Sequence, residues 1–250
     1  MEITNQSNTS ASLYFYGDIL GSSQSEDYKE CYPDDKCPKD VRDFLDEIKD
    51  VETLDIHINS GGGSVFGGIA IYNLLKAHKA YKTVHIDGIA ASIASVIAMA
   101  GDKIVLPKNA TFMIHKPMNG YFFAAMNADQ LRKDAETLDS CQKAIITSYM
   151  DKVKDGVTRE QIEDLVNEET WLVGDEAEQY FDFEIEESVE AVACTSVFFD
   201  KYEKTPKDLK PQTNIVDTEE LANIVYEKIK ADSREQLKNE ILKDLEKFSN

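Results

Sequence analysis

The sequence predicts an α/β protein built around a largely parallel β-sheet. Between residues 53 and 115, segments with apolar residues at alternate positions are interleaved with segments whose apolar residues recur every three or four positions. Strand, helix, strand, helix at this spacing is typical of βαβ units, whose strands run parallel. The length of 250 residues suggests one domain of about 200 residues with an appendage.

The first half of the chain follows this pattern in order. Its expected elements are a strand at 12–20, a loop at 21–36, a helix at 38–50, a strand at 53–60 and a helix at 65–79. The last helix contains Gly67 and Gly68, each of which costs about 1 kcal/mol in a helix interior. These glycines indicate that another segment packs closely against the helix.

The pattern continues after residue 80. The expected elements are a strand at 81–88, a helix at 92–100, short strands at 103–107 and 111–115, a long amphipathic helix at 127–153 and a closing strand at 189–194. Thr158 begins a further helix, with Gln161 in the capping-box position. We therefore expect the main domain to span residues 1–199.

The composition changes from about Asp200. Residues 200–216 hold two prolines among charged residues and are predicted to be a linker. Residues 217–250 have the pattern of a charged amphipathic helical tail. Such a tail is marginal alone, so we expect it to pack on a partner or neighbouring subunit, or to fray.

Charge and hydropathy exclude several classes of protein. The formal charge of −20 argues against nucleic acid as a partner, because few groups would neutralise phosphates. No run approaches the roughly 20 apolar residues of a membrane span. The N-terminus is polar and carries an early acid, unlike a secretory signal. A cytoplasmic location is therefore expected, with no membrane partner.

The cysteines and histidines give no sign of a metal site. The four cysteines are Cys31, Cys37, Cys141 and Cys194, and no cysteine or histidine cluster has zinc-site spacing. We interpret them as free thiols and expect no metal and no cofactor.

Ser92 and His115 are the candidate catalytic pair. Ser92 lies at the start of an apolar helix, where its amide and that of Ile93 have no acceptor within the helix. A serine needs a base to remove its proton. His115 closes a strand just before a turn, whereas His57 and His85 lie within strands. His115 is therefore the best base.

The glycine-rich segment INSGGGSVFGG supplies backbone amides on a turn. It lacks the lysine of a phosphate-binding loop and the spacing of a dinucleotide site. A structural tight turn is one interpretation. The other is an oxyanion hole, and together with the serine and histidine it indicates a serine hydrolase.

The order of these motifs resembles the ClpP-like serine peptidases, the proteolytic subunits of Clp protease. The matching segments are INSGGG, SVFGGIAIY, GIAAS, MAG, LP and FMIHKP, and the resemblance is tightest over 55–117. It implies Ser92 as nucleophile, His115 as general base, and Gly63 and Ile93 as donors of the oxyanion-hole amides.

The resemblance also implies a third catalytic residue. The segment EETWLVGDEAEQY stands where the family has an aspartate before an aromatic residue and a leucine, which makes Glu169 the matching acid. Its carboxylate would orient His115 and stabilise the imidazolium. Glu168, Asp175 and Asp164 remain alternatives, as does a Glu169 with no catalytic role.

The resemblance implies a ClpP/crotonase-type fold, a spiral of ββα units, here with a helical C-terminal extension. It further implies homo-oligomeric stacked rings paired through the long helix. Three departures resemble phage- or prophage-encoded members: Gly61 in place of the family's proline, Ile93-Ala94 after the serine, and a short serine-to-histidine interval.

The expected function is hydrolysis of polypeptide substrates through an acyl-enzyme. One setting is partnership with an ATP-driven unfoldase, and the other is cleavage of phage capsid or scaffold proteins during assembly. Two alternatives stay open. One is a catalytically decayed ClpP-like assembly subunit, and the other is a crotonase-like acyl-CoA hydratase or isomerase, although the glycine turn lacks the acids and bases this would need.

Overall fold

The computed structural model describes residues 9–120, 125–188, 194, 196–207 and 209. The chain divides into two compact units, Met1–Lys210 and Pro211–Asn250. All described residues belong to the first unit. The predicted helical tail and all but Cys194 of the predicted closing strand lie outside the described residues.

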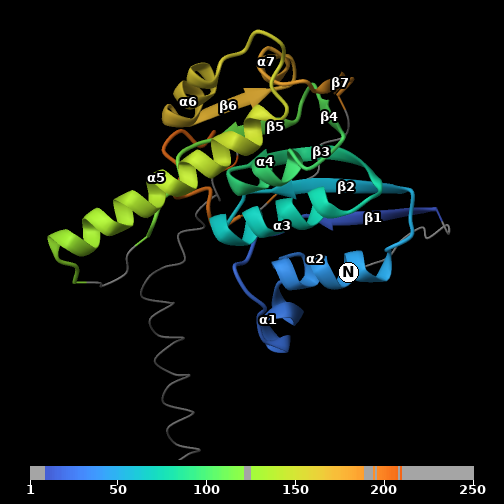
Figure 1. Cartoon of the computed structure of the whole chain (residues 1–250), viewed down its shortest axis with the longest axis horizontal. Coiled ribbons are helices and arrows are strands. Elements are labelled where there is room, and N and C mark those ends of the chain that lie inside the picture. The colour runs from blue at the N-terminus through green and yellow to red at the C-terminus, as the bar shows by residue number, and fades with distance from the viewer. Residues whose placement is uncertain (1–8, 121–124, 189–193, 195, 208, 210–250) are drawn as a thin grey trace, which may run out of the picture. The chain divides into compact units, whose positions relative to one another are not determined.

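A seven-stranded sheet forms the centre of the first unit (Figure 1). Its strands are β1 (Ser10–Phe15), β2 (Thr53–Ser60), β3 (Tyr81–Ala91), β4 (Lys103–Pro107), β5 (Thr111–Ile114), β6 (Thr170–Val173) and β7 (Glu184–Glu186). The path β1-β2-β3-β4-β7 is parallel throughout. Strand β5 pairs parallel with the end of β3 and antiparallel with β6. The predicted mixed α/β class is confirmed.

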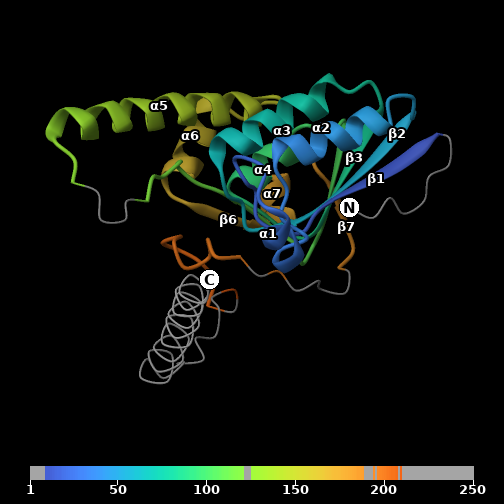
Figure 2. The same ribbon diagram turned by 90° about the horizontal axis from the view of Figure 1, so that it is seen from below.

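The helices of the described residues are α1 (Glu26–Cys31), α2 (Pro38–Glu47), α3 (Val65–Ala77), α4 (Ile93–Ala98), α5 (Ala128–Met150), α6 (Arg159–Asn167) and α7 (Asp175–Glu178). Figure 2 shows α2, α3 and α5 along one side and the orange segment near residue 200 on the other. Alternate residues of β2, namely Leu54, Ile56 and Ile58, are fully buried in the apolar core. Thr158 and Gln161 form the predicted capping box of α6.

The predicted loop at 21–36 contains a short helix, α1, which the sequence analysis missed. The Ser25 side chain caps it by accepting a hydrogen bond from the amide of Tyr28 at 3.3 Å. With only 6 residues, α1 is too short to show the apolar periodicity from which helices are predicted.

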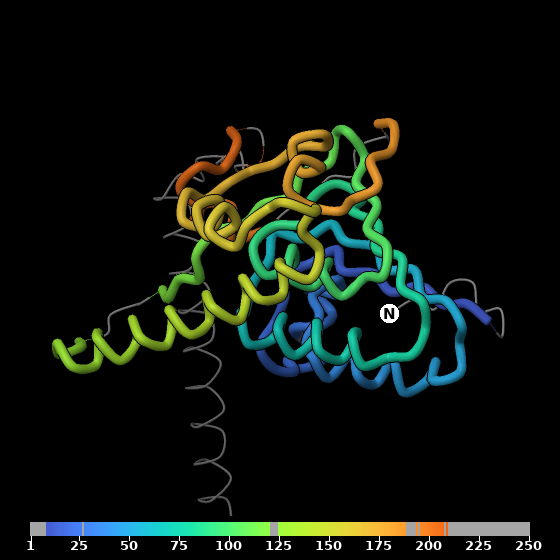
Figure 3. The backbone as a smooth tube through the Cα atoms, turned by 45° about the horizontal axis from the view of Figure 1, so that its top comes forward, coloured from blue at the N-terminus to red at the C-terminus, as the bar shows by residue number. Residues whose placement is uncertain are grey.

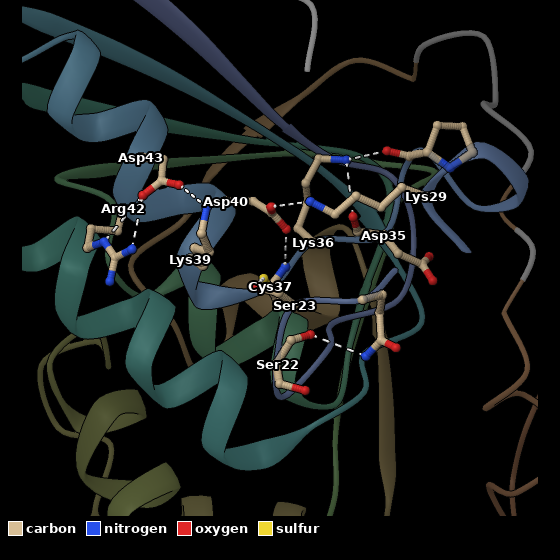
Figure 4. Close-up of polar contacts among 12 residues, drawn as sticks. Ser22, Ser23, Lys29, Asp35, Lys36, Cys37, Lys39, Asp40, Arg42 and Asp43 are labelled. Carbon is tan, nitrogen blue, oxygen red and sulfur yellow. Dashed lines mark hydrogen bonds and ion pairs between the residues drawn. The ribbon is translucent and has the colours of Figure 1, made fainter. Parts of the chain in front are cut away.

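The loop after α1 braces the glycine turn. The buried ammonium of Lys36 donates to the carbonyls of Pro33 and Asp34 at 2.8 and 2.7 Å (Figure 4). Burial lowers the pKa of Lys36. The backbone of Lys36 pairs with Ile19, which also pairs with Gly63. The charged loop is thus connected through Ile19 to the glycine turn at Gly63.

Helix α5 projects beyond the sheet (Figures 1 and 3). Its buried residues, including Cys141, Ile145 and Tyr149, belong to its second half. Leu131, in the first half, is exposed although its spacing predicts the same side as Tyr149. Among the described residues, no helix combines the length and apolarity needed to cross a bilayer.

The first part of the predicted linker, 200–216, packs on the domain instead. Tyr202 and Thr205 are buried, as is Phe199 just before them. The aromatic residues at 198, 199 and 202 interrupt the charged residues, and they give the segment apolar surface to bury.

Candidate active site

Ser92 occupies the turn between β3 and α4. Its φ and ψ are 55° and −126°, a strained conformation for a residue other than glycine. The amide of Ser92 donates to the Met113 carbonyl at 2.9 Å, which fixes the turn against β5. A serine on a sharp strand-to-helix turn presents its hydroxyl at the edge of the sheet, as in the nucleophile elbow of α/β-hydrolases.

The pairing of β3 with β5 brings His115 to Ser92. Ala91 is in register with Met113, so the residues that follow both strands meet at one edge. There Ser92 Oγ lies 2.6 Å from His115 Nε2. A serine hydroxyl can therefore pass its proton to this ring nitrogen directly.

The environment of His115 keeps its ring neutral. The side chain is buried, and this burial lowers the pKa of His115 to about 4, against the opposing charge of Glu169. At neutral pH the imidazole is uncharged, so Nε2 can accept a proton.

The pairing of β5 with β6 brings Glu169 to the same edge. Ile114 is in register with Thr170 on the antiparallel strand, so the next residues, His115 and Glu169, face one another. Glu169 is buried and has a φ of 49°. Over the described ranges, only Ser92 and Glu169 combine a side chain with a positive φ.

The three alternative acids lie elsewhere. Glu168, Asp175 and Asp164 are all exposed. The ammonium of Lys204 lies 3.3 Å from the Glu168 carboxylate. Of the four candidate acids, Glu169 alone combines burial with a place beside His115.

The Glu169 carboxylate makes its hydrogen bonds with groups other than the His115 ring. Its carboxylate accepts from Trp171 Nε1 at 3.2 Å and from the amides of Glu203 and Lys204 at 2.9 and 2.6 Å. Within the described part of the chain, no hydrogen bond joins it to His115. The carboxylate influences His115 through its charge. The structure thus gathers three groups but hydrogen-bonds only Ser92 and His115.

The glycine turn lies against Ser92. A Cβ on Gly62 would come within 2.8 Å of the Ser92 Cβ. Gly63 has a φ of 144°, and a Cβ there would meet the Ile19 carbonyl oxygen at 2.2 Å, so only glycine fits. Ile19 bonds to the peptide groups on either side of Gly63, so the Gly63 amide faces the opposite way, free of this pairing.

The two glycines of α3 let the helix pack closely against Leu20 and Ile93. A Cβ on Gly68 would lie 2.1 Å from Ile93 Cγ1, and one on Gly67 would lie 2.3 Å from the Leu20 carbonyl oxygen. The close packing predicted for these glycines is confirmed. Ile93 is the first residue of α4, so its amide has no acceptor within the helix.

Two aromatic residues beside His115 were missed by the sequence analysis. The ring of Tyr202 packs edge-on against His115 with centroids 4.8 Å apart, and Trp171 lies 6.1 Å from Tyr202. The Tyr202 hydroxyl donates to the Gly61 carbonyl at 2.5 Å. The only available signal for Tyr202 was its place among the aromatic residues at 198, 199 and 202, whereas Trp171 stands in the segment that also holds Glu169.

A comparison with protein-family models gives one match that covers the candidate site. The family described as Clp protease matches residues 42–181, more than half of the chain. The chain belongs to the Clp protease family. In this family member, the matched region contains Ser92, His115 and Glu169.

Curated Clp protease proteins share part of their length with this chain. The ATP-dependent Clp protease proteolytic subunit of Bacteroides fragilis is 30% identical over 140 residues, which are 55% of this chain and 65% of that protein. The protein of the same name from Streptococcus mutans is 33% identical over 140 residues, 55% of this chain and 69% of that protein. The chain therefore spans slightly less than two thirds of the first of these relatives.

A solved structure supports the Clp-type fold. A mutant of ClpP1 from Listeria monocytogenes superposes with a TM-score of 0.52 and 24% identity, covering 71% of this chain and 91% of that one. This likeness concerns the fold alone, and it confirms the predicted ClpP-type α/β architecture.

The described residues show no cluster for a metal. No group of three or more histidine, cysteine or acidic side chains in these ranges is arranged to hold an ion. Cys31, Cys37, Cys141 and Cys194 are free thiols, as predicted.

Proposed function

We propose that this chain is a serine endopeptidase in which Ser92 is the nucleophile and His115 the general base. The observation that supports this most directly is the 2.6 Å approach of Ser92 Oγ to His115 Nε2 on a strained turn. The membership of the Clp protease family favours peptide hydrolysis over the acyl-CoA hydratase or isomerase alternative.

In the proposed reaction, His115 Nε2 takes the proton from Ser92 as Oγ attacks the carbonyl carbon of a peptide bond. The amides of Gly63 and Ile93 would donate to the oxyanion that forms, with the N-terminus of α4 behind it. The imidazolium then gives its proton to the leaving amine, which leaves an ester on Ser92. Water, deprotonated by His115, hydrolyses this ester and restores the hydroxyl.

Glu169 would stabilise the imidazolium through its negative charge. Its charge already opposes the fall in the pKa of His115. No cofactor is required for any of these steps, because the protein groups supply both the nucleophile and the proton transfers.

Reaction with a fluorophosphonate tests the nucleophile. The wild-type chain should be labelled on Ser92, and Ser92→Ala should abolish the label. Ser140→Ala, which removes an exposed hydroxyl on α5, is the matched control and should be labelled like the wild type. Equal labelling of the wild type and Ser92→Ala would show that Ser92 is not the nucleophile.

One observation favours a second candidate, an assembly subunit of this family without turnover. The Glu169 carboxylate is hydrogen-bonded to Trp171 and to backbone amides rather than to His115. A folded, assembled protein that neither reacts with the fluorophosphonate nor degrades casein would support this candidate.

The setting of the activity is also a proposal. The relatives are named as subunits of an ATP-dependent protease. For this chain we consider stacked homo-oligomeric rings in the cytoplasm, serving an ATP-driven unfoldase or, in a phage- or prophage-type member, cleaving capsid and scaffold proteins. Casein cleavage with and without an added unfoldase and ATP separates the two: dependence on the unfoldase favours the first, and unassisted cleavage the second.

A further inference from the structure

A segment near the end of the described chain covers the candidate active site. Residues 196–205, here called the strap, place the side chains of Phe199 and Tyr202 in an apolar cluster with Ile89, Ala91 and Met113. Phe199 and Tyr202 are 1% and 4% exposed. The other three residues lie near the carboxyl ends of β3 and β5, the strands that lead to Ser92 and His115. The strap therefore covers the ends of β3 and β5 beside Ser92 and His115, which a substrate would have to approach.

The strap also lies against the glycine turn. A Cβ on Gly61 would meet Ser196 at 2.4 Å and Phe199 at 3.2 Å, and one on Gly62 would meet the Tyr202 hydroxyl at 3.2 Å. The Gly61 carbonyl already accepts the hydroxyl of Tyr202. These contacts hold the strap directly against the turn at Gly61 and Gly62.

The strap engages the acid and the base as well. Tyr202 packs edge-on against His115, and its hydroxyl and the Ser92 Cβ both lie beside Gly62. The strap amides of Glu203 and Lys204 both donate to Glu169. One segment thus shields Ser92 and His115 and binds the carboxylate that the imidazolium would need.

The strap is attached by contacts that can separate without breaking the sheet. It belongs to no strand or helix, and its own backbone hydrogen bonds are turns, such as Phe199 N to Ser196 O at 3.4 Å and Lys201 N to Phe198 O at 2.9 Å. At one end the Ser196 hydroxyl donates to Asp18 at 2.6 Å. Segments held by a few side chains, outside the backbone ladder, open at lower free energy than core strands.

We propose that the strap is an intramolecular inhibitor, which must leave the site before a polypeptide can reach Ser92. The inhibitor role rests on the proposed peptidase function. Departure of Tyr202 exposes the glycine turn and His115, and departure of the two strap amides frees Glu169 to turn toward the ring. The closed arrangement also accounts for the missing hydrogen bond between Glu169 and His115.

The test compares full-length chains by the rate at which fluorophosphonate labels Ser92. Tyr202→Ala should be labelled about tenfold faster or more, because a larger fraction of molecules is open. Lys201→Ala is the matched control: it is an exposed strap residue whose ammonium lies over the ring of Phe198, and it should be labelled at the wild-type rate. Tyr202→Phe keeps the ring but loses the bond to Gly61, and it should show a smaller increase.

Trp171, the only tryptophan of the chain, reports on the strap independently. Its emission should shift in Tyr202→Ala, because its neighbouring ring is removed and its partner Glu169 is released. If the emission shifts but Ser92 is labelled at the wild-type rate in both Tyr202 variants, the strap is not an inhibitor, and the proposed peptidase function is unaffected. If no variant and no wild-type protein is labelled, both the proposed peptidase function and the inhibitor role of the strap are wrong. Should Tyr202→Ala not fold, Tyr202→Phe decides the question.

Discussion

Ser92 Oγ and His115 Nε2 lie 2.6 Å apart because their strands, β3 and β5, pair in parallel just before them, with Ala91 in register with Met113. The hydrogen bond is therefore a consequence of strand register.

Removing the imidazole should remove most of the activity. His115→Ala leaves Ser92 without a base, and casein hydrolysis should fall by about a hundredfold or more. His85→Ala is the control, because His85 is half-buried within β3 and stacks on His57. Equal losses in both variants would point to damaged folding rather than lost base catalysis.

Neutralising Glu169 should slow turnover more than it weakens substrate binding. Glu169→Gln removes the negative charge that stabilises the imidazolium, so kcat should fall by about a hundredfold while KM changes little. Glu168→Gln, at the exposed neighbour, should retain its activity. The reverse pattern would assign the third position to Glu168.

The buried histidine should make stability depend on pH. His115 has a pKa of about 4 when folded, below the ordinary value near 6.5. Above pH 6.5 the ring is neutral in both states. As the pH falls from 6.5 to 4, the unfolded chain binds a proton that the folded chain does not, and the free energy of unfolding drops by about 3 kcal/mol.

Urea unfolding of the wild type and His115→Gln across this range measures that contribution. The variant carries no titrating ring, so its stability should fall less with decreasing pH. Parallel curves for the two proteins would contradict the low pKa of His115.

Opening the strap should shift the acid limb of Ser92 labelling. Burial lowers the pKa of His115, and Tyr202 supplies part of that cover. In Tyr202→Ala the midpoint should therefore rise from about 4 toward the ordinary value, so the open variant loses reactivity at a higher pH than the wild type. An unchanged midpoint would show that Tyr202 does not shield the ring.

Filling the space at Gly68 should destabilise the fold. A Cβ there would lie 2.1 Å from Ile93 Cγ1 at the start of α4, so Gly68→Ala should cost about 1–3 kcal/mol in thermal or urea unfolding. Gly120→Ala is the control, since a Cβ at Gly120 meets nothing within 4 Å. A stable Gly68→Ala variant would mean that α3 and α4 separate more easily than their packing suggests.

The sequence was informative where periodicity is strong. The strand at 53–60 and the helix that begins at Thr158 follow directly from alternation and capping, and both are present as predicted. Helix α1 and the packing of residues 200–207 were missed, because a single turn and a few aromatic residues among charges give no periodic signal.

By itself, the sequence determined the α/β class, the serine and the histidine, since these depend on local pattern and on motifs that lie close together along the chain. It left four acids open for the third position. The antiparallel register of Ile114 with Thr170 favours Glu169, and the strap that binds this carboxylate begins more than twenty residues later. Only the tertiary structure decides which acid lies beside His115 and where the strap packs, because strand register and side-chain burial arise from contacts between distant segments.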